Sequence, residues 1–165
     1  MLSVKLKEGK IMEGSSVGQV LISGYDRFET FQTNRITTEI HTQKELTNQL
    51  EAIADLQSAF MRDRSQKVID YSQSPMKEVV DRVRVVVPYL LKEGVYQWED
   101  SQKVQELIDE LRAQPQQIHP LIEQASTRIH QFFQERNQIA DIVGQMLKEI
   151  REAILRYLTA TRKDR

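Results

Sequence analysis

Two pairs of carboxylates are the side chains whose type and spacing could support catalysis. Glu78 and Asp81 are three residues apart in one stretch of helical pattern, and Glu106 and Asp109 repeat that spacing in the next. Residues three apart lie on one face of a helix. If the two faces met, their carboxylates would suit a Mg²⁺ ion and a nucleotide polyphosphate. The simpler interpretation is that both pairs belong to solvated helix faces, where this spacing is common.

This spacing resembles the pattern of the all-α nucleoside triphosphate pyrophosphohydrolases of the MazG type. The resemblance covers residues 78–109 and implies Mg²⁺-dependent hydrolysis of a nucleotide at the four carboxylates. The family usually has a further adjacent Glu, whereas Lys77 precedes the first carboxylate here. Arg82 and Arg112 could instead be ion-pair neighbours of the two pairs. A pyrophosphohydrolase is therefore an alternative function.

The remaining residues favour a protein without a metal, a cofactor or a catalytic centre. The chain has no cysteine, and its three histidines, His41, His119 and His130, form no Glu-x-x-His or His-Glu-x-x-His motif. Di-iron bundles and zinc hydrolases depend on those motifs. The sequence also has no glycine-rich phosphate loop, and the segment Gly14-Ser15-Ser16-Val17-Gly18, which has the spacing Gly-x-Ser-x-Gly, is interpreted as only a loop. We expect a non-enzymatic protein.

Charge gives little reason to expect a nucleic-acid partner. The 165 residues include 23 lysines and arginines against 24 aspartates and glutamates, for a formal net charge of −1. Such a chain has no global field that would attract an anionic polymer. Arg156, Arg162, Lys163 and Arg165 gather near the C-terminus, where cations more often complement the end of a helix. A nucleic-acid-associated helical protein is a further alternative.

The clearest pattern is a seven-residue repeat near the C-terminus, with apolar residues at alternating spacings of three and four. Eleven of its twelve positions are apolar, which predicts a coiled-coil-like seam. The next position of the repeat is also mostly apolar, so the stripe is wider than a two-helix seam and must be covered by other helices or a second chain. The twelve positions are Ile122, Ala125, Ile129, Phe132, Arg136, Ile139, Val143, Met146, Ile150, Ala153, Tyr157 and Ala160, and the adjacent apolar residues are Phe133, Ala140, Leu147 and Ile154.

Arg136 is the one charged residue in this repeat. A charge in a buried seam is costly unless it is paired, and one polar residue in a seam often fixes register or oligomeric state. A two-fold axis or a carboxylate from a facing helix could meet it. Alternatively, the arginine extends its charged end to water along its apolar stem.

The sequence predicts a mainly α fold, an elongated helical bundle with two long antiparallel helices, two shorter intervening helices and a small N-terminal β-like arm. Short apolar runs between glycines indicate a β-hairpin arm over 1–34, with the helical bundle over 35–165. Prolines are expected to start, kink or end helices. The predicted helices are 36–72, 75–93, 101–114, which ends at Pro115, and 120–162, which begins at Pro120.

Two aromatic residues, Tyr96 and Trp98, lie in a linker between predicted helices. Exposed Trp and Tyr anchor many interfaces, although Trp98 could instead cap the end of the bundle core. The candidate interaction residues are therefore Arg136, Phe132, Phe133, Met146, Tyr157, Tyr96 and Trp98.

Together these patterns predict a bacterial protein-interaction or assembly component that acts through long amphipathic helices and forms a homo-oligomer. In outline it looks like small helical proteins of bacterial secretion systems, which is an analogy of fold only. The N-terminus lacks the apolar run of a signal peptide, and no apolar stretch approaches the roughly 20 residues of a membrane span. We expect a cytoplasmic protein, with signal-independent secretion left open.

Overall fold

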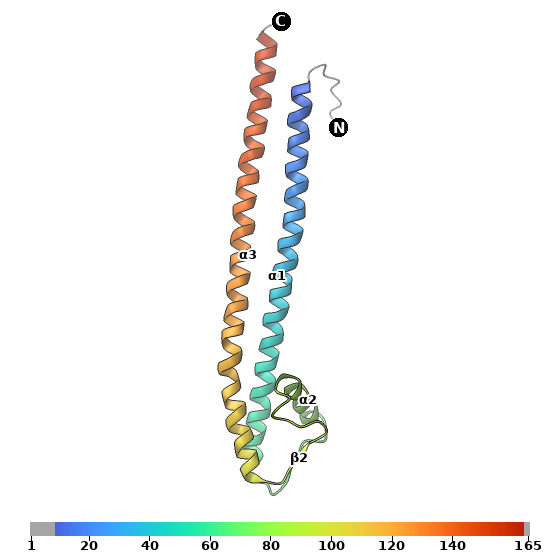
Figure 1. Cartoon of the computed structure of the whole chain (residues 1–165), viewed down its shortest axis with the longest axis vertical. Helices are drawn as coiled ribbons and strands as arrows, with labels where there is room; N and C mark the ends of the chain where they lie inside the picture. Colours follow the sequence, from blue (N-terminus) through green and yellow to red (C-terminus); the bar gives the residue numbers. More distant parts are fainter. Residues whose placement is uncertain (1–8, 164–165) are drawn as a thin grey trace. The chain divides into compact units, whose positions relative to one another are not determined.

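The computed structural model describes residues 9–163, with side chains for 16–161. Two long helices carry most of this part of the chain, as predicted, and the fold is mainly helical (Figure 1). In chain order the elements are α1 (Gly9–Asp63), β1 (Ile69–Asp70), α2 (Met76–Val86), β2 (Gln97–Trp98) and α3 (Ser101–Lys163).

The internal contacts divide the chain into two units. Unit 1 comprises Met1–Thr38 and Ile129–Arg165, and unit 2 comprises Glu39–Arg128. The first part of α1 and the last part of α3 therefore form unit 1, while the second part of α1 and the first part of α3 join α2 and the strands in unit 2.

The expected β-hairpin arm is wrong for residues 9–34, which are helical and belong to α1. The expected strand over residues 2–6 lies outside the described residues. Within α1 the less exposed positions of this region, Gly18, Leu21, Tyr25 and Phe28, are three or four residues apart, which is the period of a helix face. A glycine inside a helix costs only about 1 kcal/mol, so the glycines that suggested turns do not prevent a helix that packs against α3.

Between α1 and α3 the predicted helices are too long. The predicted helix over 36–72 ends at Asp63, and residues beyond it form β1, which pairs antiparallel with β2 through Ile69 opposite Trp98. The predicted helix over 75–93 ends at Val86. Val87 has φ −129° and ψ 66°, because a residue before a proline is pushed out of the helical region, and Pro88 follows.

The two predicted helices 101–114 and 120–162 are one continuous helix, α3, with Pro115 and Pro120 inside it. Its buried positions keep helical spacing across both prolines, so ending the helix would remove part of this stripe from the core. Pro120 is exposed, so water can bind the carbonyl that its missing N–H leaves free. The buried positions are Val104, Ile108, Leu111, Gln114, Ile118 and Ala125.

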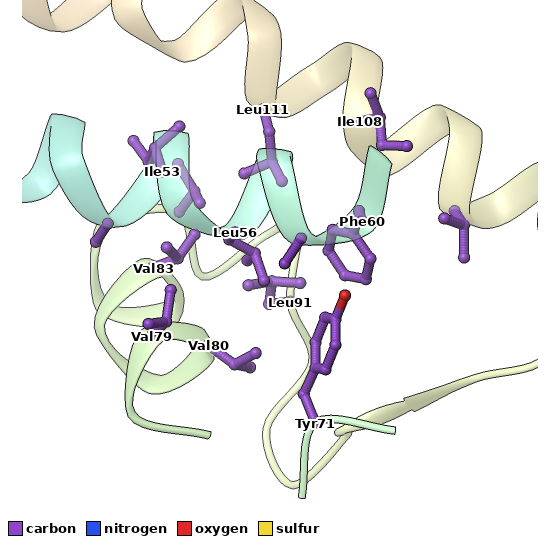
Figure 2. Close-up of a cluster of buried hydrophobic side chains, with 14 of the residues drawn as sticks. Ile53, Leu56, Phe60, Tyr71, Val79, Val80, Val83, Leu91, Ile108 and Leu111 are labelled. Carbon is purple, nitrogen blue, oxygen red and sulfur yellow. The ribbon is translucent and has the colours of Figure 1, made fainter. Parts of the chain in front are cut away.

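The core of unit 2 lies where α1, α2 and α3 meet. Figure 2 shows Ile53, Leu56 and Phe60 of α1 between valines of α2 and the α3 residues Ile108 and Leu111. Phe60 also contacts the ring of Trp98 edge-on, with 5.0 Å between centroids, and that of Tyr71 at 5.4 Å. The strand pair therefore extends the core with two aromatic rings.

Asp63 joins the end of α1 to this aromatic cluster. The Tyr71 hydroxyl donates to Asp63 Oδ2 at 2.9 Å, and Gln66 Nε2 donates to Oδ1 at 3.1 Å. The hydrogen bond from Arg62, followed by that from Tyr71, outweighs desolvation and lowers the pKa of Asp63 below its usual value. Burial and this same carboxylate raise the pKa of Tyr71.

This arrangement predicts an acid-sensitive contribution to stability. Because the pKa of Asp63 is lower folded than unfolded, its stabilisation is present above the unfolded value, near 4, and is lost as the pH falls through the folded value. We expect the urea midpoint of the wild type to fall more between neutral and acidic pH than that of Asp63→Asn. Parallel pH dependence of the two proteins would contradict this assignment, and Tyr71→Phe should show an intermediate response.

The continuity of α3 predicts that Pro120→Ala stabilises the protein. The change restores a backbone N–H that can donate to the carbonyl of Gln116, and alanine favours helix far more than proline does. We expect a gain of about 1–3 kcal/mol, measured by thermal or urea unfolding followed by circular dichroism. Pro88→Ala, outside any helix, is the matched control. A gain no larger than that of the control would mean that α3 is interrupted at Pro120.

Candidate interaction site

Unit 1 is a pair of antiparallel helix segments whose facing side chains form a seam. Residues Glu29, Gln32 and Arg35 of α1 contact successively earlier residues of α3, which establishes the antiparallel direction. Most seam residues of α3 are only half-buried, and Phe132 alone among them is buried. The α3 seam residues are Ile129, Phe132, Arg136, Ile139, Ala140, Val143, Leu147, Ile150, Ile154 and Tyr157.

The predicted repeat matches this seam as far as Ile139. Beyond it Val143, Ile150 and Tyr157 keep their predicted positions in the seam, whereas the other series of positions shifts by one residue. Met146, which the repeat placed inside, is 42% exposed, whereas the adjacent Leu147 is half-buried. The same change puts Ile154, rather than Ala153, in the seam. A straight α-helix rotates slightly with each seven-residue repeat, so the residue that faces the partner helix changes along its length. The broad apolar stripe tolerates this change, because the adjacent positions are apolar too.

Sequence reasoning found a seven-residue repeat in α1 only over residues 46–60 and missed its continuation through the first half of the helix. Positions seven residues apart along α1 are all half-buried or buried. In the first half of the helix, however, some of these positions hold glycine or polar residues, so no apolar pattern reveals the repeat. The one signal in the sequence was the spacing: counting back by seven from the apolar residues in the second half of the helix leads to these positions. These positions are Gly18, Tyr25, Gln32, Glu39, Leu46, Ile53 and Phe60.

The polar centre of the seam is a hydrogen-bonded cluster that includes the buried Gln32, which is 2% exposed. Gln32 Nε2 donates to Glu135 Oε2 at 2.9 Å, and Arg35 Nη1 lies 3.5 Å from the same oxygen. The Arg35 guanidinium stacks over the ring of Phe132 at 3.8 Å from its centroid, a cation–π contact. Phe132 is therefore covered by a charge rather than by an apolar side chain.

Arg136 is paired across the seam, as one of its two interpretations required. Its Nη2 lies 3.8 Å from Glu29 Oε1, and both side chains remain more than a third exposed. An ion pair in this setting contributes at most about 1 kcal/mol. The charge of Arg136 therefore adds little to the free energy of unfolding, and its main effect is to favour a carboxylate at the facing position of α1.

Several large apolar side chains next to the seam remain exposed. Each neighbours a seam residue in sequence, and α1 and α3 both contribute. We call the following four the flank residues: Phe31 (58% exposed), Phe133 (41%), Ile142 (51%) and Met146 (42%).

An apolar groove of about 330 Å³ lies between the helices of unit 1 at Gly18, which occupies a seam position without a side chain. A Cβ added to Gly18 would meet nothing within 4 Å, so the missing side chain accounts for open space rather than for close packing. The groove is lined by Gly18, Gln19, Ile22, Leu147, Ile150, Arg151, Ile154 and Leu155.

In unit 2 the predicted contact residues Tyr96 and Trp98 both pack against other residues of the same unit. The Tyr96 hydroxyl donates to Asp81 Oδ1 at 2.7 Å, and Arg84 packs on its ring and donates to the carbonyl of Val95 at 2.9 Å. Trp98 packs on Phe60, which matches the interpretation that it caps the core.

A larger groove, of about 810 Å³, opens beside Trp98 in unit 2. Its apolar surface comes from both the linker and α3, and four carboxylates and two lysines also line it. We call it the tip groove. It is lined by Tyr89, Leu90, Lys92, Val95, Gln97, Trp98, Glu99, Asp100, Lys103, Glu106, Leu107 and Glu110.

The four carboxylates of the pyrophosphohydrolase pattern make separate local contacts. Asp81 accepts from Tyr96 and Arg84, and Glu78 accepts from the Ser74 hydroxyl at 2.6 Å. Glu106 and Asp109 each accept from a glutamine four residues earlier in α3. Among the described side chains, no three His, Asp or Glu residues are grouped so that they could hold a metal ion.

Comparison of the chain with protein-family models, curated proteins and solved structures finds no match. In the described part of the chain, no helix is both long and apolar enough to cross a membrane. The exposed apolar surface of unit 1 and the tip groove are therefore the features from which function must be inferred.

The polar cluster predicts a cost for removing Glu135. Glu135→Ala leaves the buried amide of Gln32 and the guanidinium of Arg35 without their shared acceptor, and an unsatisfied buried polar group costs about 1–3 kcal/mol. Urea unfolding should show this loss, whereas Glu149→Ala, at an exposed position of the same helix, should change little.

The double variant Gln32→Leu/Glu135→Leu separates this explanation from simple loss of helix contacts. Replacing both partners by apolar side chains removes the unsatisfied groups, so it should recover much of the stability lost in Glu135→Ala. A double variant at least as unstable as the single one would contradict the role given to the hydrogen bond.

Proposed function

We propose that this protein is a non-enzymatic assembly component that associates with copies of itself through its long helices. The observation that carries the proposal is the exposure of the flank residues beside a half-buried seam in unit 1. Two helix segments alone cannot cover the broad apolar stripe of α3.

Burial of the flank residues supplies the driving force for association. Covering one large apolar side chain contributes about 1.5–3 kcal/mol. Ile142 and Met146 are four residues apart on α3 and share a face. A second copy that presents the same face would bury both pairs in a two-fold symmetric contact, the commonest kind of interface between identical chains.

The polar cluster supports the alignment of the two helix segments within one chain. A polar side chain within an apolar seam favours the register in which its partners are satisfied. Gln32, Arg35 and Glu135 already satisfy one another within one chain. The apolar side chains beside them can therefore meet another copy without a further unpaired charge.

Association as homo-oligomers also fits the analogy with small helical proteins of bacterial secretion systems. That analogy and the cytoplasmic location remain predictions from sequence. Self-association requires neither.

Sedimentation velocity tests the proposal. From about 1 to about 100 µM the wild type should shift from monomer to oligomer, and Ile142→Ser/Met146→Ser should weaken association at least roughly tenfold. The matched control is Val85→Ser, which changes an exposed apolar residue of α2 in unit 2. Circular dichroism would check that each variant keeps its helical content.

A wild type that sediments as a monomer at every concentration would overturn the proposal. An oligomer that is unaffected by the Ile142→Ser/Met146→Ser change would show association through another surface and would overturn the role given to the flank residues.

A further inference from the structure

A line of cations and leucines runs along the last turns of α3, and two of its residues, Arg151 and Leu155, also line the apolar groove of unit 1. Lys148, Arg151, Leu155 and Leu158 are spaced by three or four residues and are all exposed, so they follow one another along one face of the helix. In sequence Arg162 continues the spacing, whereas the nearby Glu149 and Glu152 fall outside it, and Glu152 pairs with Arg156. We call these residues from Lys148 to Arg162 the basic–leucine stripe.

Two features of the stripe are typical of a surface that binds a partner. Leu155 is 53% exposed and Leu158 is 44% exposed, so two large apolar side chains meet water side by side. Cations lie on both sides of them in the sequence. A complementary surface must therefore offer an apolar floor with carboxylates around it.

The tip groove of unit 2 is such a surface. Leu90, Trp98 and Leu107 supply apolar side chains, and four carboxylates against two lysines give the rim a formal charge of −2. Glu106 and Glu110 are four residues apart on the α3 wall of the groove, and Lys148 and Arg151 are three residues apart on the stripe, so each pair lies on one face of its helix.

We propose that the basic–leucine stripe of one copy docks in the tip groove of a second copy. The proposal rests on the self-association proposed above and adds a second, different contact to it. Leu155 and Leu158 pack against the apolar floor, while Lys148 and Arg151 lie against the acidic rim. Opposite charges on the two surfaces speed encounter and disfavour contacts between two stripes or two grooves.

The contact joins two different surfaces, so it is heterologous. Each copy keeps a free groove or a free stripe after docking, and further copies can add until a ring closes or a filament forms. The two-fold contact through the flank residues, by contrast, is complete with two copies.

Charge reversal at the two surfaces tests the docking. Glu106→Lys/Glu110→Lys gives a basic groove and a basic stripe, and Lys148→Glu/Arg151→Glu gives an acidic groove and an acidic stripe. Each variant alone should lose the salt-sensitive assemblies larger than a dimer, because its own surfaces repel. An equal mixture of the two should regain them, since every groove then meets an oppositely charged stripe. Glu45→Lys/Glu51→Lys, at exposed sites on α1 away from the groove, is the matched control and should assemble as the wild type does.

Engineered cysteines give a second measurement that does not depend on charge. The chain has no cysteine of its own, so a disulfide between Val95→Cys and Leu158→Cys chains mixed under mild oxidation reports this contact directly. The expected product is a dimer that contains one chain of each variant. Its absence, or its persistence after the groove charges are reversed, would overturn the docking.

The outcomes separate this proposal from the one on which it rests. If charge reversal leaves the assemblies unchanged while Ile142→Ser/Met146→Ser disrupts them, the docking is wrong and self-association stands. If the wild type never associates, both fail. If Lys148→Glu/Arg151→Glu abolishes binding to phosphatidylserine vesicles but leaves assembly unchanged, the stripe is a membrane-surface site and the docking is overturned.

Discussion

The structure depends on a seven-residue spacing shared by α1 and α3. In both helices the residues that face each other recur with this period, which keeps one line of contact along a helix pair. The period alone does not provide burial. Along α1 it passes from the large apolar residues of unit 2, such as Ile53 and Phe60, to Gln32 and Gly18 in unit 1. The same geometry therefore gives a dry core in one unit and a half-exposed seam in the other.

The two units differ in the elements that pack on the helix pair and bury its apolar side chains. In unit 2 the valines of α2 and the aromatic rings of the strand region pack on α1 and α3 (Figure 2). In unit 1 the described residues supply only the two helix segments. The polar cluster around Gln32 compensates in part, because it satisfies groups that would otherwise be buried without partners. It does not cover Ile142 or Met146, which is why those side chains remain exposed.

The sequence was sufficient for whatever depended on an uninterrupted apolar period. It predicted a mainly helical fold with two long helices and the inward position of Phe132 and Arg136, because the repeat in the last helix is nearly pure. It failed where a local preference opposed a tertiary contact. Glycines in residues 9–34 suggested turns, and Pro115 and Pro120 suggested helix ends, yet packing along α3 outweighed both. The cluster of Gln32, Arg35 and Glu135 could not be predicted, because Glu135 is 103 residues from Gln32 in the chain and no apolar pattern marks the pair.

A near-neutral net charge does not mean that the charges are evenly distributed over the surface. A total of −1 excludes a long-range field over the whole molecule, but it does not require each surface to be neutral. On α3 alone, Glu106 and Glu110 lie at the tip groove, whereas Lys148 and Arg151 lie near the opposite end of the same helix. Screening limits these charges to distances of about 8–10 Å, so each acts on a surface in contact rather than on a remote ligand. A chain with locally separated but balanced charges is suited to recognising another copy of itself, because every excess on one surface has its counterpart elsewhere in the same sequence.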